Sequence, residues 1–140
     1  MFGRPLLLSL ALVLTAAAAP AQQDQITATA AITATIDAQL DAFTHRDAAR
    51  AFSYASPMIH GLFGTPENFA AMVATGYPMV WSPKDAKMLE LRDVAGSLWQ
   101  RVHITDANGK GWLLDYQMVQ TPDGWRINAV EVLPGTDLGA

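Results

Sequence analysis

The chain has 140 residues, of which 51% are hydrophobic and 16% are charged, and its formal net charge is −4. These values are typical of one globular domain and exclude a disordered chain. The acidic balance argues against nucleic acid as a partner, because phosphate backbones attract basic surfaces. The sequence contains no cysteine, so neither a disulfide nor a cysteine-linked lipid is available, and hydrophobic burial must hold the fold.

The N-terminus has the pattern of a secretory signal peptide. Arg4 precedes an apolar run from Leu6 to Ala19, and Ala19-Pro20-Ala21 provides a cleavage motif of small residues. The run is shorter than the roughly 20 apolar residues that span a bilayer, so we expect no stable membrane insertion after cleavage. The sequence therefore predicts a signal peptide over residues 1–21, cleavage after Ala21 and a periplasmic or secreted protein.

The first predicted helix follows a polar segment, residues 22–31, which we expect to be a flexible leader. Its apolar residues recur at the helical spacing of three to four and lie on one face; they are Ile32, Ile36, Leu40 and Phe43. The threonines between positions 27 and 35 weaken the first turns, because β-branched side chains lose rotamer freedom in a helix.

Two further helices are predicted between this helix and Pro83. Asp47 is a suitable N-cap for the second, which should end near Ser56 because Pro57 disfavours helical geometry in the residue before it. An irregular stretch, 58–64, is expected next. Thr65-Pro66 then has the form of an N-cap followed by a proline at the first helical position, and Gly76 ends this third helix.

The C-terminal half changes to short runs separated by turn residues, which predicts an antiparallel sheet. Four strands are expected, at 87–94, 98–105, 111–120 and 125–133. Helices followed by a meander of strands give an α+β domain, which we place at residues 32–134, with 135–140 as a C-terminal tail.

The turns fix the predicted strand pairing. A two-residue turn at Asn108-Gly109 places Val102 opposite Asp115 and Arg101 opposite Tyr116. A three-residue loop at 122–124 would place Asp115 opposite Glu131. One sheet face then carries Trp99, Arg101, His103, Trp112, Leu114, Tyr116 and Met118.

Several segments resemble the nuclear transport factor 2-like superfamily, the cone-fold or SnoaL-like proteins. They are Gln39-Leu40-Asp41-Ala42-Phe43, Thr65-Pro66-Glu67-Asn68-Phe69 and Gly124-Trp125-Arg126-Ile127. The resemblance implies three N-terminal helices packed on a strongly curved antiparallel sheet of about four strands. Tyr54-Ala55-Ser56-Pro57 and Phe63-Gly64-Thr65-Pro66 are also similar to an exported bacterial family of unknown function. The superfamily hosts isomerases, dehydratases, carriers and association modules, so the resemblance leaves the function open.

Aromatic and apolar residues on the predicted sheet face could line a pocket for a small apolar ligand. The expected lining is Trp99, Arg101, Trp112, Tyr116 and Met118, with Phe43 and Leu40 from the first helix. The alternative is that the same side chains form the core or a homodimer interface through the sheet, where aromatic neighbours across strands are more often found.

Asp115 is the candidate general base, since burial on an apolar face would raise the pKa of its carboxyl. Glu131 opposite it and His103 are the candidate assistants, and a solvated polar patch is the alternative. Neither a metal-ligand spacing nor a cofactor motif is present, so we expect no metal and no cofactor. Three functions stay open: a non-catalytic module for ligand binding or self-association, an isomerase or lyase using Asp115, and an envelope protein-protein adaptor.

Overall fold

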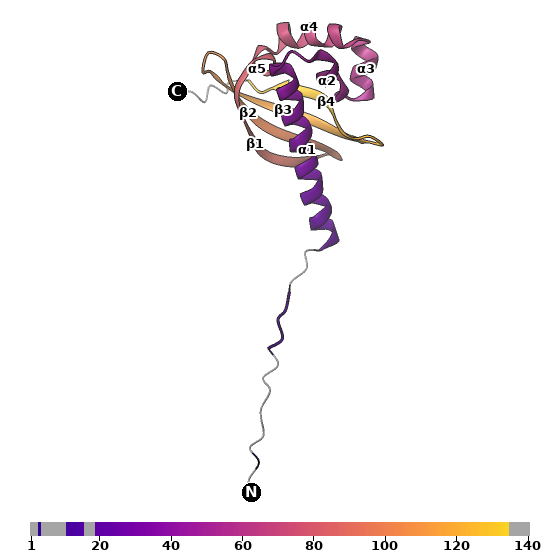
Figure 1. Cartoon of the computed structure of the whole chain (residues 1–140), viewed down its shortest axis with the longest axis vertical. Coiled ribbons are helices and arrows are strands. Elements are labelled where there is room, and N and C mark those ends of the chain that lie inside the picture. The colour runs from indigo at the N-terminus through magenta and orange to yellow at the C-terminus, as the bar shows by residue number, and fades with distance from the viewer. Residues whose placement is uncertain (1–2, 4–10, 16–18, 135–140) are drawn as a thin grey trace.

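The computed structural model describes residues 3, 11–15 and 19–134 (Figure 1). In this part of the chain, five helices precede four strands, which confirms the α+β class. The predicted tail, 135–140, and most of the predicted signal peptide lie outside the described residues. The elements are α1 (Pro20–Thr44), α2 (Ala48–Ser53), α3 (Pro57–Phe63), α4 (Pro66–Gly76), α5 (Pro78–Trp81), β1 (Pro83–Val94), β2 (Ser97–Asp106), β3 (Gly111–Thr121) and β4 (Gly124–Val132).

Helix α1 starts at Pro20, not near Ile32, so the segment predicted as a flexible leader forms the first half of the helix. The hydroxyl groups of Thr29 and Thr33 donate hydrogen bonds to backbone carbonyl groups of the preceding turn, at 2.8 and 3.1 Å. A threonine hydroxyl bonded in this way is compatible with a helix, which explains why the threonine-rich stretch does not interrupt it. Among the described residues, no helix is both long enough and apolar enough to cross a membrane.

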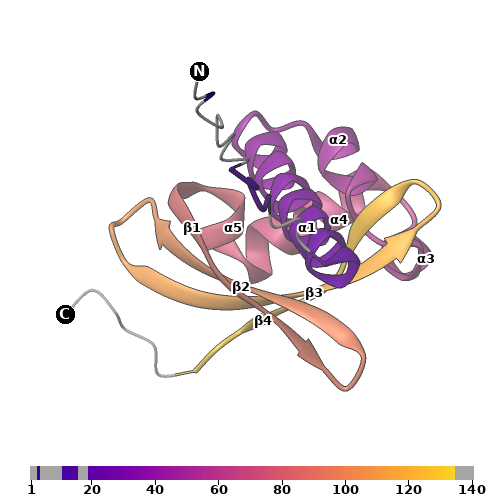
Figure 2. The same ribbon diagram turned by 90° about the horizontal axis from the view of Figure 1, so that it is seen from below.

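The apolar stripe of α1 is confirmed. Its members Ile32, Ile36, Leu40 and Phe43 are all buried in the core. Figure 2 shows α1 lying over one face of the sheet with the other helices on the same side. The opposite side, which we call the outer face, is not covered by the described helices.

Helices α3 and α4 begin with the same local structure. Ser56 and Thr65 are the N-caps, and each side-chain oxygen accepts a hydrogen bond from the backbone three residues on, at 3.3 and 3.2 Å. A proline follows each cap at the first helical position. The prediction of an irregular segment over 58–64 is therefore wrong, because Ser56 starts a helix there and Gly64, with φ of +75°, ends it.

The four strands form an antiparallel sheet in the order β1-β2-β3-β4, which confirms the meander. Strand β1 starts at Pro83, earlier than predicted. Its pairing with β2 shifts register between Pro83 and Asp85 and again at a bulge between Met88 and Leu91. A further bulge lies in β4 opposite Gln117 and Met118. Bulges bend strands and increase their twist, which accounts for the strong curvature of the sheet in Figure 2.

The predicted pairing of β2 with β3 is wrong by one residue. Arg101 lies opposite Asp115, and Val102 lies opposite Leu114. The cause is Asp106: its backbone N–H donates to the Lys110 carbonyl at 2.8 Å, and its carboxylate accepts from two N–H groups of the loop. This closes a loop of three residues instead of two.

The slip of one residue moves side chains to the opposite face of the sheet, because successive side chains alternate. The face toward the helices carries Leu98, Gln100, Val102, Ile104, Trp112, Leu114, Tyr116 and Met118. The outer face carries Trp99, Arg101, His103, Leu113 and Asp115.

The predicted pairing of Asp115 with Glu131 is confirmed, although the loop between β3 and β4 differs from the prediction. Thr121 pairs with Gly124, so this loop has two residues instead of three. The bulge at Asn128 supplies the missing residue within β4 and restores the expected pairing beyond it.

Candidate functional site

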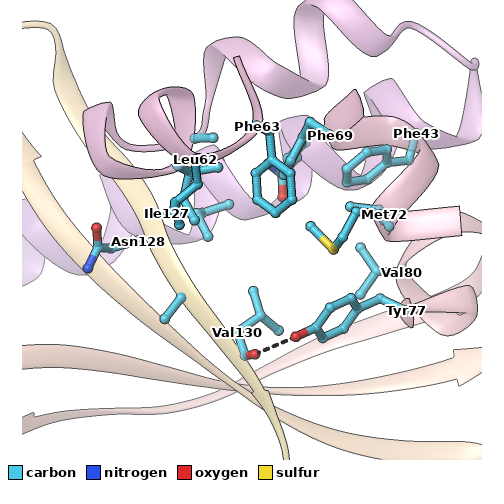
Figure 3. A pocket seen from close by; sticks show the side chains of 15 residues that line it. Phe43, Leu62, Phe63, Phe69, Met72, Tyr77, Val80, Ile127, Asn128 and Val130 are labelled. Carbon is cyan, nitrogen blue, oxygen red and sulfur yellow. Dashed lines mark hydrogen bonds between the residues drawn. The ribbon is translucent and has the colours of Figure 1, made fainter. Parts of the chain in front are cut away.

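A cavity of about 270 Å³ lies between α3, α4 and β4 (Figure 3). We call it the α3–β4 cavity. Helix α1 and the start of α5 complete its wall. Its lining residues are Gln39, Phe43, Ala55, Ile59, Leu62, Phe63, Phe69, Met72, Val73, Tyr77, Val80, Ile127, Asn128, Ala129 and Val130.

The helical wall of the cavity is built on a cluster of aromatic rings. The Phe69 ring centroid lies 5.9 Å from that of Phe43 and 5.8 Å from that of Phe63, in tilted arrangements that aromatic pairs favour. Met72 extends its sulfur into the space between this cluster and Val130 (Figure 3). The wall is therefore apolar and comes from three different helices.

Polar groups in the lining are largely occupied by contacts within the protein. Gln39 donates to the Ala51 carbonyl at 3.1 Å, and the Tyr77 hydroxyl donates to the Val130 carbonyl at 3.2 Å. Asn128 accepts from the Ser56 hydroxyl at 2.8 Å and donates to a neighbouring glutamine. No lining residue carries a charge. The cavity is therefore suited to an uncharged apolar group, because an ion would lose its hydration there without a counter-charge.

The rim of the cavity on α3 is apolar and exposed. Leu62 lines the cavity and is 68% exposed, and Met58, one turn earlier on the same helix, is 51% exposed. Helix α3 has no fully buried residue. An apolar surface therefore continues from the cavity onto α3, where a bound molecule would cover it.

The seven residues predicted to line a pocket are divided by the structure. Phe43 alone among them lines the α3–β4 cavity. Leu40, Tyr116 and Met118 are buried in the core, Trp112 packs at its edge, and Trp99 and Arg101 lie on the outer face. The predicted set came from a β2–β3 pairing that was one residue out, which mixed the two faces. The helical spacing of the α4 residues Phe69, Met72 and Val73 was the sequence signal for one wall of the actual cavity.

Asp115 lies on the outer face in a network of ion pairs. Its side chain is 8% exposed, and its carboxylate accepts from Arg92 at 3.1 Å and faces Arg101 at 3.7 Å. Arg101 also pairs with Glu90 at 3.0 Å. The bond to Asp115 raises the pKa of Arg92. Burial of Asp115 was expected, but the surroundings are arginines and not an apolar pocket. The sequence did not indicate Arg92 or Glu90, because the β1 bulge sets their positions.

The two predicted assistants of Asp115 also lie away from the cavity. Glu131 is exposed beside Asp115, and His103 lies opposite Leu113 and Lys87 on the outer face. Over the described residues, no cluster of three acidic or histidine side chains is arranged to hold a metal ion. The outer face, with the ion pairs around Asp115, is therefore a separate surface on the far side of the sheet from the cavity.

Two polar side chains enter the core from the sheet. Gln100 donates to the Leu89 carbonyl at 3.0 Å, which satisfies a backbone group in the β1 bulge. The Tyr116 hydroxyl is fully buried and has no hydrogen-bond partner among the described residues. Burial raises the pKa of Tyr116, with a smaller contribution from Tyr77. Its hydroxyl is therefore neutral under ordinary conditions.

Comparison with known proteins identifies a family but no individual relative. No curated protein and no solved structure matches the chain. Residues 25–140 match the family described as Domain of unknown function (DUF4864), and the match includes most of α1 and every later element. The chain therefore belongs to the DUF4864 family.

Proposed function

We propose that the protein is an exported, non-catalytic binding module that holds an uncharged apolar group in the α3–β4 cavity. The observation that carries the proposal is the lining, which combines aromatic and aliphatic side chains with no charged residue. A dry cavity of about 150 Å³ is large enough to bind benzene. By that scale, about 270 Å³ accommodates roughly eleven non-hydrogen atoms.

Export and the cone fold belong to the same proposal. The N-terminal pattern of Arg4, an apolar run and a small-residue motif supports a signal peptide that is removed after Ala21. A strongly curved four-stranded meander with helices on one face supports the nuclear transport factor 2-like fold. Carriers are among the functions of that superfamily, and catalysis at Asp115 is not part of this proposal, because its oxygens face arginines on the other side of the sheet.

A probe of the right size tests the cavity. We expect naphthalene to bind with a dissociation constant of tens of micromolar, which corresponds to a binding free energy of about −6 kcal/mol. NMR of the methionine and valine methyl groups measures this binding. Met72 and Val130 should show the largest shifts, since both side chains point into the cavity (Figure 3). Naphthalene-2-sulfonate should bind at least tenfold more weakly, because its charge would be buried without a partner.

Two matched variants locate the binding. Met72→Trp fills the cavity and should abolish naphthalene binding, whereas Val94→Trp places the same ring at an exposed position of β1, outside the lining. Equal binding by both variants, or tighter binding of the sulfonate than of naphthalene, would contradict the proposal. Thermal unfolding of each variant checks that the fold is intact.

A further inference from the structure

Strand β4 is an edge of the sheet, and its outward backbone groups can be identified from the pairing. The Leu133 N–H donates to the Leu113 carbonyl at 2.9 Å. In an antiparallel pair, alternate residues bond to the neighbouring strand, so Glu131 and Ala129 also bond to β3. The N–H and C=O groups of Val130 and Val132 therefore point away from the sheet.

The first part of this edge is already covered by the chain itself. The Ile127 carbonyl accepts from the Ser56 N–H at 2.8 Å, and the Ile127 N–H donates to the Tyr54 carbonyl at 2.9 Å. The α2–α3 connection therefore forms an isolated parallel bridge with β4. Farther along, the Tyr77 hydroxyl donates to the Val130 carbonyl. Within the described residues, no such bond reaches the Val130 N–H or either outward group of Val132.

The uncovered edge runs beside the α3–β4 cavity. Ile127 and Val130 line the cavity from β4, and α3 and α4 face them from the other side (Figure 3). A strand added to this edge would lie roughly 4.8 Å from β4, and alternate side chains would point into the cavity.

We propose that the β4 edge from Val130 to Val132 binds an extended, uncharged peptide segment of a partner protein, which inserts an apolar side chain into the cavity. The inference rests on the proposed function and deepens it, because it names the carrier of the apolar group. Outward backbone groups provide the hydrogen bonds, as in other cases of strand addition, and the cavity provides the preference for an apolar residue. A volume of about 270 Å³ suits one aromatic or two small aliphatic side chains.

A synthetic peptide with alternating apolar residues is the probe: acetyl-Ser-Leu-Thr-Phe-Thr-Leu-Ser-amide. We expect it to bind the full mature chain in calorimetry. Two N-methylated versions make the test specific, because only alternate N–H groups of an added strand face β4. Methylation of one alternate set should weaken binding at least tenfold, and methylation of the other set should leave it nearly unchanged.

A matched pair of protein variants tests the edge itself. Val132→Pro removes an outward N–H without breaking a bond to β3, a position at which edge strands tolerate proline. Val132→Thr keeps the N–H and the β-branched shape. We expect the proline variant to bind the peptide at least tenfold more weakly than the threonine variant, while both bind naphthalene equally.

The outcomes separate this inference from the proposed function. The peptide inference would be overturned if both Val132 variants bound the peptide equally, or if the two methylated sets had equal effects. If naphthalene still bound normally, the proposed apolar site would be unaffected. Failure of the unaltered protein to bind either naphthalene or the peptide would overturn both proposals. If Val132→Pro fails to fold, the pair of methylated peptides decides the question alone.

Discussion

Tyr116 and Tyr77 differ in how their hydroxyl groups are satisfied, and this difference predicts opposite effects of the same substitution. The Tyr116 hydroxyl is buried with no partner among the described residues, whereas the Tyr77 hydroxyl bonds to the Val130 carbonyl. An unsatisfied buried hydroxyl costs free energy, and a satisfied one contributes about 1 kcal/mol. We expect Tyr116→Phe to maintain or raise the free energy of unfolding by up to about 1 kcal/mol, and Tyr77→Phe to lower it by about 1 kcal/mol.

Urea denaturation of the two variants checks this expectation. The slope of the transition should stay unchanged in both, which shows that the unfolded states remain comparable. Destabilisation by Tyr116→Phe equal to that by Tyr77→Phe would show that the Tyr116 hydroxyl has a partner in solution.

Asp106 predicts a pH dependence at the β2–β3 loop. A hydrogen bond from Trp112 lowers the pKa of its carboxyl, and the backbone N–H groups of Lys110 and Asn108 lower it further. Because the pKa is lower in the folded state, the stabilisation is complete above the unfolded value of about 3.9 and is lost as the pH falls through the folded value. Asp106→Asn should therefore be less stable than the unaltered protein at neutral pH and approach it in strong acid.

Two measurements test this prediction. Thermal midpoints of both proteins between neutral pH and strong acid give the stability difference, and the indole N–H resonance of Trp112 reports the titration of Asp106 directly. A difference in stability that stays constant across the acid range would contradict the assigned role of the carboxylate.

At the level of the elements, the caps of α3 and α4 offer a matched comparison. Ser56 and Thr65 cap in the same way, but Ser56 is buried and also donates to Asn128 in β4. Replacing an N-cap by alanine typically costs about 1 kcal/mol. We expect Thr65→Ala to cost about 1 kcal/mol and Ser56→Ala about 2 kcal/mol, since a buried acceptor also loses its donor. Denaturant unfolding measures both, and equal losses would contradict the contribution of Asn128.

The helices that were predicted correctly are those whose local sequence pattern agrees with the contacts they make in the folded protein. The α1 stripe and the Thr65-Pro66 start of α4 were read correctly, because periodicity and capping are local. Ser56-Pro57 carries the same start signal, but it was interpreted only as the end of the preceding helix. The seven residues of α3 bury no side chain completely, so hydrophobic periodicity gave no indication of a helix there.

Strand pairing was less predictable than strand position. Asn108-Gly109 alone indicates a two-residue turn, but Asp106 bonds to the loop backbone and lengthens it. One residue of slip was enough to place Trp99 and Arg101 on the wrong face and to misplace the pocket. The Arg92–Asp115 pair was not predictable either, because it depends on a bulge that no local motif announces.

At the scale of the whole molecule, the proposed export predicts where the mature protein would begin. Because α1 begins at Pro20, cleavage after Ala21 would place the N-terminus of the mature protein within the first turn of this helix. We expect the intact mass of protein recovered from a bacterial periplasm to match a chain starting at Gln22. Replacing Ala19 and Ala21 by bulky residues should retain the full-length precursor. Recovery of the unprocessed chain from the unaltered gene would contradict the signal peptide.

The whole-molecule architecture also separates two surfaces that the sequence had merged. The apolar cavity lies on the helical side of the sheet, and the ion pairs around Asp115 lie on the other side. Substitutions on one surface should therefore leave the other unaffected, which makes ligand binding and the outer ion pairs separately testable.

The extra residue at Asn128 has a consequence for chain-length changes in this hairpin. This residue compensates for the short loop between β3 and β4. Insertion of one residue into the loop, or deletion of Asn128, would therefore shift the pairing of one part of β4 with β3. Made together, the two changes would cancel over most of the strand. Length variants of this hairpin should consequently be tolerated in compensating pairs and rejected singly.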